Sequence, residues 1–216
     1  MLVESVPNYS EGRRLDVVDH LAAAVTRTAG AFLLDRTSDA SHNRSVLTLA
    51  GEAEAVVAAL EATVATAVAT IDMEAHSGEH PRIGAVDVVP FVPLGGTSMD
   101  DCIGLARAFG RRVAEGFEIP VYLYARAATR PDRVRLADVR RGGYEALRDD
   151  IATDPQRTPD FGPRRTHPRA GPDLLIADRQ SLAYRVCAPG AALPGFRSPH
   201  DFIASMIPSR SDASTV

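Results

Sequence analysis

Strand-like and helix-like segments alternate along residues 1–150, and their order restricts the chain to few architectures. Apolar, β-rich runs occupy residues 2–6, 31–35, 45–50, 83–93 and 119–124. Apolar side chains recur at helical spacing in residues 15–25, 56–68 and 99–113. The first six elements in this order match a split βαβ arrangement. We therefore expect an α/β (α+β) fold: a mixed β-sheet with helices packed on one face around a ferredoxin-like core.

Polar residues and glycines mark where the predicted helices begin and end. Ser10 precedes the first helix, Gly30 follows it, and Gly51 opens the second. Ser98 lies three residues before Asp101, which is approximately the spacing of a capping box. The third helix should therefore begin directly after Ser98.

The composition changes at about residue 153, where proline, glycine, arginine and serine accumulate. Nine of the 15 prolines lie beyond this point. Such a stretch has few periodic apolar runs and is expected to be largely irregular. Residues 174–177 and 182–186 are short exceptions that suit a strand or a turn of helix.

Charge and composition narrow the classes of function. The net charge is −4 and the pI is about 5.9, whereas nucleic-acid binders usually present a basic face, so we expect no nucleic-acid partner. No window approaches 18 uninterrupted apolar residues, and the first residues do not resemble a signal peptide. Two cysteines are too few for a disulfide framework. A cytoplasmic protein without a membrane segment is the expectation.

The densest group of polar side chains lies just before residue 83. His76, Glu79, His80 and Arg82 fall within seven residues, and two glycines and a proline exclude a regular helix there. This segment should be a loop that leads into a strand, where functional groups are often displayed. A histidine can exchange a proton near neutral pH, and Glu79 or Asp87 could orient it. The alternative is that these are ordinary solvated loop residues.

The spacing of His76, Glu79 and His80 also matches an inverted zinc-protease pattern. That chemistry needs both histidines on one helical face. Gly78 and Pro81 disfavour such a helix, and no third ligand is evident at a suitable spacing. We therefore expect no metal, and a zinc hydrolase is the least favoured alternative.

Two further polar segments follow predicted strands. Asp39, Asn43 and Arg44 lie between the second and third strands, where an arginine can grip a carboxylate and an aspartate can orient a base or a cationic nitrogen. Asn8 and Ser10 follow the first strand and could meet an anionic group at a helix start. Turn formation and helix capping are the structural alternatives for these residues.

Read together and in order, these segments resemble the glutamate formiminotransferase family. The resemblance rests on VPNYSEGR at residues 6–13, HNRSV at 42–46, the segment 71–87, VPFVP at 89–93, IPVYLY at 119–124 and PDFGP at 159–163. It covers residues 1–171. It implies an N-terminal formiminotransferase subdomain at 1–171, followed by a Pro/Arg-rich, largely irregular tail at 172–216. Ser41 departs from the aspartate that members of this family often carry.

The resemblance implies formimidoyl transfer between N-formimino-L-glutamate and tetrahydrofolate, with tetrahydrofolate as a substrate. An amine attacks an amidine carbon, and protons must leave the attacking nitrogen and reach the departing one. His80 matches the catalytic histidine of the family, and we expect Asp39 and Arg44 to assist it. The residues implied in binding substrate or folate are Asn8, Ser10, Asn43, Arg82, Phe161, Gly162 and Pro163.

The family continues into a second subdomain of comparable size, and the active-site cleft lies between the two. The 45 residues that follow the resemblance cannot build that subdomain. We therefore expect a C-terminal-subdomain partner or self-association, and activity that depends on a second subdomain supplied in trans. A non-catalytic module that binds folate or a partner chain is the alternative function.

Overall fold

A computed structural model of the protein describes residues 1–79, 81–171 and 175–177. Within these ranges the strands are β1 (Leu2–Ser5), β2 (Asn8–Tyr9), β3 (Ala31–Asp39), β4 (Arg44–Glu52), β5 (Val86–Leu94), β6 (Tyr122–Leu123) and β7 (Leu175–Ala177). The α-helices are α1 (Leu15–Thr26), α2 (Ala53–Thr70), α3 (Met99–Phe117), α4 (Leu136–Val139) and α5 (Gly143–Asp150). Short 3₁₀ helices occupy Ala125–Ala127, Pro131–Arg133 and Pro155–Arg157.

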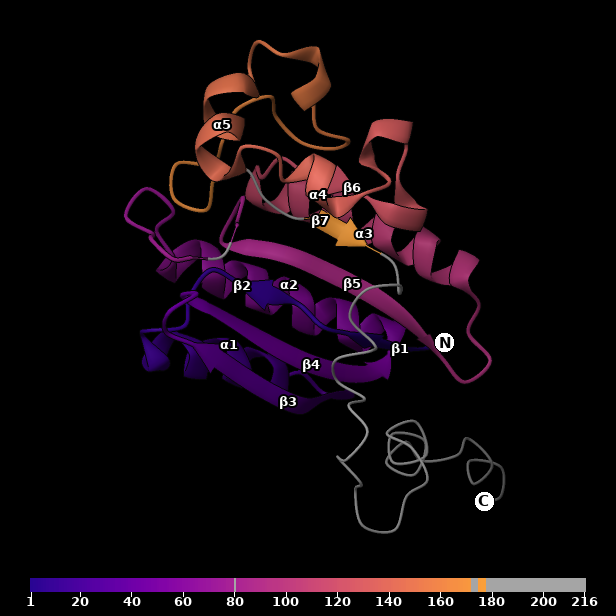
Figure 1. Ribbon diagram of the computed structural model, residues 1–216. Helices are drawn as coiled ribbons and strands as arrows, with labels where there is room; N and C mark the ends of the chain where they lie inside the picture. Colours follow the sequence, from indigo (N-terminus) through magenta and orange to yellow (C-terminus); the bar gives the residue numbers. More distant parts are fainter. Residues whose placement is uncertain (80, 172–174, 178–216) are drawn as a thin grey trace, which may run out of the picture.

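The strands form one mixed sheet around a split βαβ core. β1 and β2 are successive pieces that lie between β4 and β5 and run antiparallel to both. β3 pairs with the outer side of β4, also antiparallel. Beyond β5, β7 and then β6 add to the sheet in parallel. The predicted ferredoxin-like core and mixed sheet are therefore confirmed (Figure 1).

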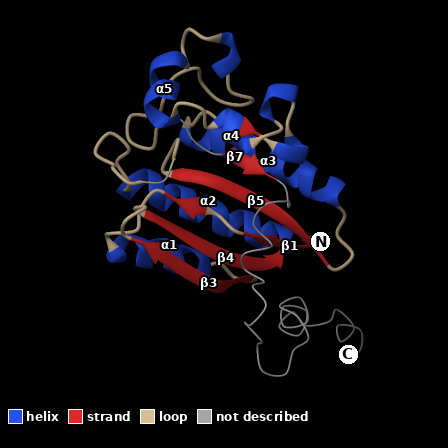
Figure 2. Ribbon diagram, viewed as in Figure 1, coloured by secondary structure: helices blue, strands red, loops and turns tan. Residues whose placement is uncertain are grey.

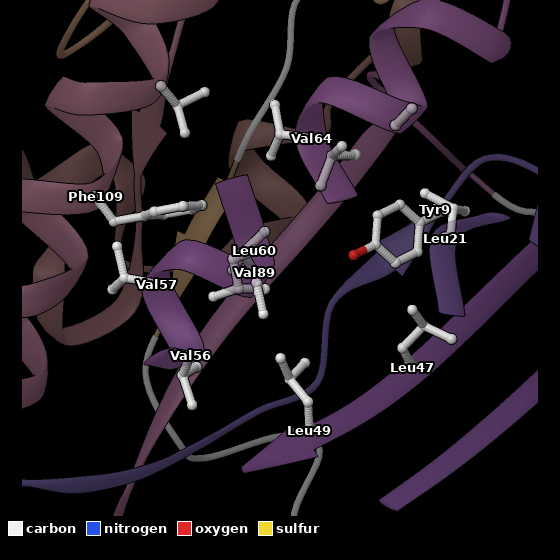
Figure 3. Close-up of a cluster of buried hydrophobic side chains, with 14 of the residues drawn as sticks. Tyr9, Leu21, Leu47, Leu49, Val56, Val57, Leu60, Val64, Val89 and Phe109 are labelled. Atoms are coloured by element: carbon white, nitrogen blue, oxygen red, sulfur yellow. The ribbon is translucent and has the colours of Figure 1, made fainter. Parts of the chain in front are cut away.

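Helices α1, α2 and α3 form the main helical layer on one face of the sheet, as predicted (Figure 2). Their apolar sides meet Leu47 and Leu49 of β4 and Val89 of β5, and all three side chains are buried (Figure 3). Burying a leucine or valine side chain contributes roughly 1.5–3 kcal/mol, so this interface is the principal source of stability. Tyr9 also lies here and donates a hydrogen bond from its hydroxyl to Thr63 Oγ1 at 2.8 Å.

Among the described residues, α2 has the length and composition of a helix able to cross a membrane. Its apolar side packs against α1, α3 and the sheet, and the side chains of Val56, Leu60 and Val64 are buried there. The apolar composition of α2 is therefore accounted for by its position in the core.

A smaller apolar cluster lies on the other face of the sheet near β5 and β6. Val88 belongs to this cluster, whereas its neighbour Val89 belongs to the main core, because successive strand residues point to opposite faces. Val139 of α4 and Leu147 of α5 cover Val88 and Tyr122 there. The segment 125–151 thus forms a second layer that the predicted single helical face did not include.

Several predicted boundaries differ from the structure. α1 begins at Leu15, and Ser10 does not cap it; Glu11 instead accepts hydrogen bonds from the backbone N–H groups of Arg13 and Arg14, each at 2.9 Å. Gly51 lies within β4, which ends at Glu52, and α2 begins at Ala53. The capping box formed by Ser98 and Asp101 is confirmed.

The end of the described chain returns to the sheet. β7 falls within residues 174–177, one of the two segments predicted as a strand or a turn of helix, and it lies between β5 and β6. The other segment, residues 182–186, lies outside the described residues. The boundary between residues 171 and 172 stays a prediction.

Candidate active site

Three polar segments from distant parts of the sequence meet at one end of the sheet. They are residues 10–14 after β2, the β3–β4 turn at residues 39–44, and the loop at residues 76–82 before β5. Glycines allow the close approach. A Cβ at Gly12 would lie 2.4 Å from the carbonyl oxygen of Asp39, and a Cβ at Gly78 would lie 2.4 Å from that of His42. No side chain larger than hydrogen fits at either position without moving the backbone.

Asn43 links all three segments. It adopts a φ of 49°, a left-handed conformation that asparagine tolerates better than most residues. Its Oδ1 accepts a hydrogen bond from the backbone N–H of Gly12 at 3.0 Å, and its Nδ2 donates to the carbonyl oxygen of Ser77 at 3.0 Å. These contacts give Asn43 a structural role, and its predicted contact with substrate stays a prediction.

Arg44 lies at the centre of the charged contacts. Its Nε and Nη2 donate to Asn8 Oδ1 at 3.0 and 2.5 Å, and its Nη1 donates to Asp87 Oδ2 at 3.2 Å. Asn8 is oriented in turn, because its Nδ2 donates to the carbonyl oxygen of Val6 at 2.9 Å. Burial lowers the pKa of Arg44, while Asp87 acts in the opposite direction. Two predicted site residues, Asn8 and Arg44, are therefore in direct contact.

Asp87 binds a second arginine that sequence reasoning missed. Arg140 caps the C-terminus of α4, and its Nη2 pairs with the same Oδ2 atom of Asp87 that Arg44 contacts. Asp87 Oδ1 accepts from the backbone N–H of Ile83 at 3.1 Å. The site thus joins β4, β5 and α4. No motif surrounds Arg140, which lies 53 residues from Asp87 in an arginine-rich stretch, so the sequence carried no signal for it.

His76 is held in one tautomer by its neighbours. Its Nδ1 lies 2.7 Å from Arg82 Nε, which can only donate, so the proton resides on Nε2 and is donated to the carbonyl oxygen of Asn43 at 3.1 Å. Burial lowers the pKa of His76 below its usual value, and the charge of Arg82 acts in the same direction. His76 is therefore neutral at pH 7, and it positions Arg82.

Arg82 is also engaged on its other side. Its Nη2 donates to the carbonyl oxygen of His76 at 2.9 Å and to Glu145 Oε1 at 3.0 Å, and its guanidinium carbon lies 5.9 Å from the centre of the Tyr144 ring. This arrangement connects the loop before β5 to α5. Among the described residues, Arg82 contacts His76, Glu145 and Tyr144. Its predicted role in binding substrate stays a prediction.

His80, the predicted acid/base, lies outside the described residues. Its two suggested orienting residues are described. Glu79 is exposed, and its backbone N–H faces the carbonyl oxygen of Ser41 at 3.4 Å. Asp87 has both carboxylate oxygens occupied by Arg44, Arg140 and the backbone, as described above. The zinc alternative also depends on His80, and both ring nitrogens of its partner, His76, already have protein partners.

Asp39 forms the β3–β4 turn. Its Oδ1 accepts from the backbone N–H groups of Ser41 and His42 at 2.8 and 2.9 Å, and its Oδ2 lies 2.9 Å from His42 Nδ1. These contacts with His42 lower the pKa of the Asp39 carboxyl. Asp39 is exposed, so it is accessible to a ligand as well as being part of the turn. Its catalytic role stays a prediction.

The space between these groups is small. A cavity of about 10 Å³ is bordered by Ser10, His42, Asn43, Arg44, His76, Arg82 and Asp87. This volume accommodates about one water molecule. Ser10 is buried, and its hydroxyl donates to the carbonyl oxygen of Gly84 at 2.6 Å. The structure therefore brings together five predicted site residues. Four of them border the cavity, namely Ser10, Asn43, Arg44 and Arg82, and Asn8 joins them through its contact with Arg44.

The three predicted folate-binding residues near the end of the domain lie elsewhere. Phe161 pairs with Val121 next to β6, and Arg111 of α3 lies over its ring at 5.0 Å. Gly162 has a φ of 86°, and a Cβ there would lie 2.4 Å from the carbonyl oxygen of Ile119. Neither these two residues nor Pro163 borders the small cavity. Their predicted contact with folate stays a prediction.

A larger cavity of about 290 Å³ lies beside α4 and the 3₁₀ helices. Tyr122 and Val139 supply its apolar wall, and the rest of its lining is mostly charged. Arg133, which borders it, is buried against Asp160 and lies over the Tyr122 ring. Within the described residues, no three His, Cys, Asp or Glu side chains gather in a way that could hold a metal ion.

Comparisons of the chain with known proteins and protein families are consistent with this arrangement of motifs at one end of the sheet. Residues 2–177 match the formiminotransferase domain, N-terminal subdomain. The chain belongs to the formiminotransferase family. This confirms the resemblance inferred from the motifs and places the chain in a family of transferases.

Relatives within the formiminotransferase family are similar over most of this chain. It is 46% identical over 187 residues to glutamate formimidoyltransferase of Thermoplasma acidophilum, covering 86% of this chain and 61% of that protein. It is 44% identical over 185 residues to formimidoyltransferase-cyclodeaminase of Rattus norvegicus, covering 86% of this chain and 34% of the relative. Glutamate formimidoyltransferase of Streptococcus pyogenes is 40% identical, with 62% of its length covered. The chain thus spans about a third to three fifths of these relatives.

Proposed function

We propose that this chain supplies the N-terminal part of a glutamate formimidoyltransferase active site, which transfers a formimidoyl group between N-formimino-L-glutamate and tetrahydrofolate. The observation that carries the proposal is the meeting of three family motifs around Arg44, Asn8 and Asp87 at one end of the sheet. The names of the similar proteins from Thermoplasma and Streptococcus support the same reaction.

The reaction requires bond exchange at an amidine carbon and movement of protons. An amine of tetrahydrofolate attacks the formimino carbon, and a new C–N bond forms. The bond between that carbon and the glutamate nitrogen then breaks, so one proton must leave the attacking nitrogen and one must reach the departing nitrogen. We assign this proton transfer to His80. His76 is unsuited to it, because both of its ring nitrogens already hold the loop and Arg82 in place.

The surrounding residues would bind and orient the two substrates. Both substrates carry carboxylates, and Arg44 offers a guanidinium that is held in place by Asn8 and Asp87. Asp39, exposed at the β3–β4 turn, would orient the reacting nitrogen or the base. Phe161, Gly162 and Pro163 would contact the folate, whose flat ring favours apolar walls.

We further propose that a second subdomain completes the cleft and that the assembled enzyme acts on these small molecules in the cytoplasm. The cavity at the meeting point of the three segments holds about one water molecule, so most of each substrate must lie outside it. A second wall would enclose the substrates and exclude water from the reacting carbon.

A transfer assay with purified protein tests the proposal. The chain would be incubated with formimino-glutamate and tetrahydrofolate, alone and after addition of the remaining C-terminal part of the Thermoplasma enzyme, and the modified folate would be measured. We expect turnover in the mixture and at least a hundredfold loss with His80→Ala, in line with the usual contribution of a general acid/base.

His20→Ala is the matched control, because His20 is an exposed histidine on α1. Unchanged turnover with His80→Ala would refute the role of His80. Folate binding without turnover in any mixture would favour a non-catalytic folate-binding module instead.

A further inference from the structure

A buried carboxylate, that of Asp160, lies directly before the three residues proposed to contact folate. Its side chain is 6% exposed, and that of its partner Arg133 is 4% exposed. Oδ2 accepts from Arg133 Nη1 and, at 2.8 Å, from the backbone N–H of Leu123, while Oδ1 accepts from the hydroxyl of Thr129. The carboxylate therefore joins the segment around residue 160 to β6, to Thr129 and to the 3₁₀ helix Pro131–Arg133.

Arg133 holds the same segment at a second point. Its Nη2 donates to the carbonyl oxygen of Thr158, and its guanidinium carbon lies 5.1 Å from the centre of the Tyr122 ring. A buried ion pair often adds little net stability compared with apolar residues of similar size, so its presence here is better explained by the conformation that it fixes. That conformation is the one of residues 158–160.

The backbone carries this constraint into Phe161. The N–H groups of Asp160 and Phe161 both donate to the carbonyl oxygen of Val121, at 2.8 and 3.2 Å, and the N–H of Val121 donates to the carbonyl oxygen of Phe161 at 2.9 Å. The Phe161 ring is partly buried against the main core, and Arg111 lies over it. The position of this ring therefore depends on how residue 160 is held.

Phe161 lies level with Asp87 along the strands. A single residue of β7 pairs with Val88 of β5 and with Tyr122 of β6, and Val121, which precedes Tyr122, pairs with Phe161. Three strand spacings of about 4.8 Å place Phe161 roughly 14 Å from Asp87. Tetrahydrofolate is elongated, with its reacting amine in the pterin ring system at one end and its carboxylates at the other. One such molecule is long enough to span this distance.

We propose that Asp160 is a positioning residue for the folate substrate, which holds Phe161–Pro163 in the conformation that contacts folate. This rests on the proposed function. Asp160 acts through its neighbours, because its carboxylate is buried and both of its oxygens already have protein donors. Without the carboxylate, Arg133 would be buried without a counter-ion, so the segment would have to move to expose it. Folate binding is weakened by this movement, whereas the contacts of Arg44 are unaffected.

Calorimetric titration of the full chain with 5-formyltetrahydrofolate, a stable reduced folate, tests the proposal. In Asp160→Asn, which keeps the shape of the side chain, the affinity should fall about tenfold, because a displaced Phe161 loses its packing against the folate ring. In the transfer assay described above, KM for tetrahydrofolate should rise by a similar factor while KM for formimino-glutamate is unchanged. Partial unfolding would instead lower the amount of active enzyme and leave both KM values as they are.

Two further variants complete the experiment. Thr129→Val removes one hydrogen bond from Asp160 at an exposed position and leaves no buried charge. It should decrease the folate affinity about threefold, and it keeps the test decisive if Asp160→Asn does not fold. Asp132→Asn is the matched control, since Asp132 pairs with Arg130 in the neighbouring 3₁₀ helix and is 49% exposed. Its folate affinity and both KM values should match those of the wild type.

The outcomes separate this inference from the proposed reaction. Equal folate affinity of Asp160→Asn and wild type, a parallel rise of both KM values, or a wild-type chain that binds no folate would each overturn the positioning role. Folate binding that depends on Asp160, without formimidoyl transfer, would refute the proposed reaction and leave the positioning role standing.

Discussion

Replacing Asp87 with asparagine removes the only carboxylate that contacts both Arg44 and Arg140 within the described residues. The side chain keeps its shape, and its amide oxygen can still accept from the backbone N–H of Ile83. Two arginines that are 16% and 14% exposed then lose their shared counter-ion. Breaking a buried ion pair from one side costs about 3–5 kcal/mol. Because Asn8 still accepts from Arg44, we expect a loss near the lower end, about 3 kcal/mol in the free energy of unfolding.

Urea denaturation of wild type and Asp87→Asn measures this loss, and thermal unfolding should show a decrease of roughly 6–12 °C in Tm for a domain of this size. Asp19→Asn is the control, since Asp19 pairs with Arg36 on the surface with 61% of its side chain exposed, and such pairs contribute about 0–1 kcal/mol. A loss below about 1 kcal/mol for Asp87→Asn would refute the reasoning, because the two arginines would then be adequately solvated without a counter-ion.

Two other predictions concern the loop before β5. Gly78→Ala places a Cβ 2.4 Å from the carbonyl oxygen of His42, so the loop must move. We expect the rate of formimidoyl transfer to fall at least tenfold, while circular dichroism shows that the fold is retained. Full activity of this variant would contradict the tight fit at Gly78. The folded pKa of His76 is lowered, so its contribution to stability is present above its unfolded pKa of about 6.5 and is lost as the pH falls below that value. Urea denaturation at pH 7.5 and pH 5.5 should show that the free energy of unfolding decreases less between these pH values for His76→Gln than for wild type. Equal decreases would exclude His76 as a contributor to the pH dependence of stability.

Local patterns in the sequence were sufficient to predict most of the fold. The helical spacing after Ser98 and the capping box with Asp101 depend on residues within a few positions of one another, and α3 begins where they indicate. The order of strands and helices then restricts the sheet to a split βαβ core, because short connections and right-handed crossovers exclude most alternatives.

Boundaries were predicted less well where a distant partner decides the conformation. Ser10 has the residue type of a helix cap and precedes α1, yet its hydroxyl donates to the carbonyl oxygen of Gly84, which lies 74 residues away. The predicted strand at residues 119–124 is reduced to the two residues of β6, since only Tyr122 and Leu123 pair with β7. No local pattern contains information on these partners.

The motifs of the candidate site could be predicted from the sequence, but the contact between Arg140 and Asp87 could not. Arg44 and Asn8 belong to separate motifs, and the structure brings them into contact. Arg140 contacts Asp87 because α4 folds back over the far face of β5, and this depends on the small apolar cluster that includes Val88 and Val139. Tertiary packing, which the sequence pattern does not encode, therefore determines the second arginine.

The burial of β5 on both faces has a consequence for how this domain can evolve. Val88 faces the cluster under α4, and Val89 faces the cluster under α2 and α3. Inserting or deleting one residue in β5 would exchange these two faces and shift the register with β1 on one side and β7 on the other. Length variation among homologues should therefore be confined to the surface connections, and Asp87 should keep a fixed sequence distance from the hydrophobic residues of this strand.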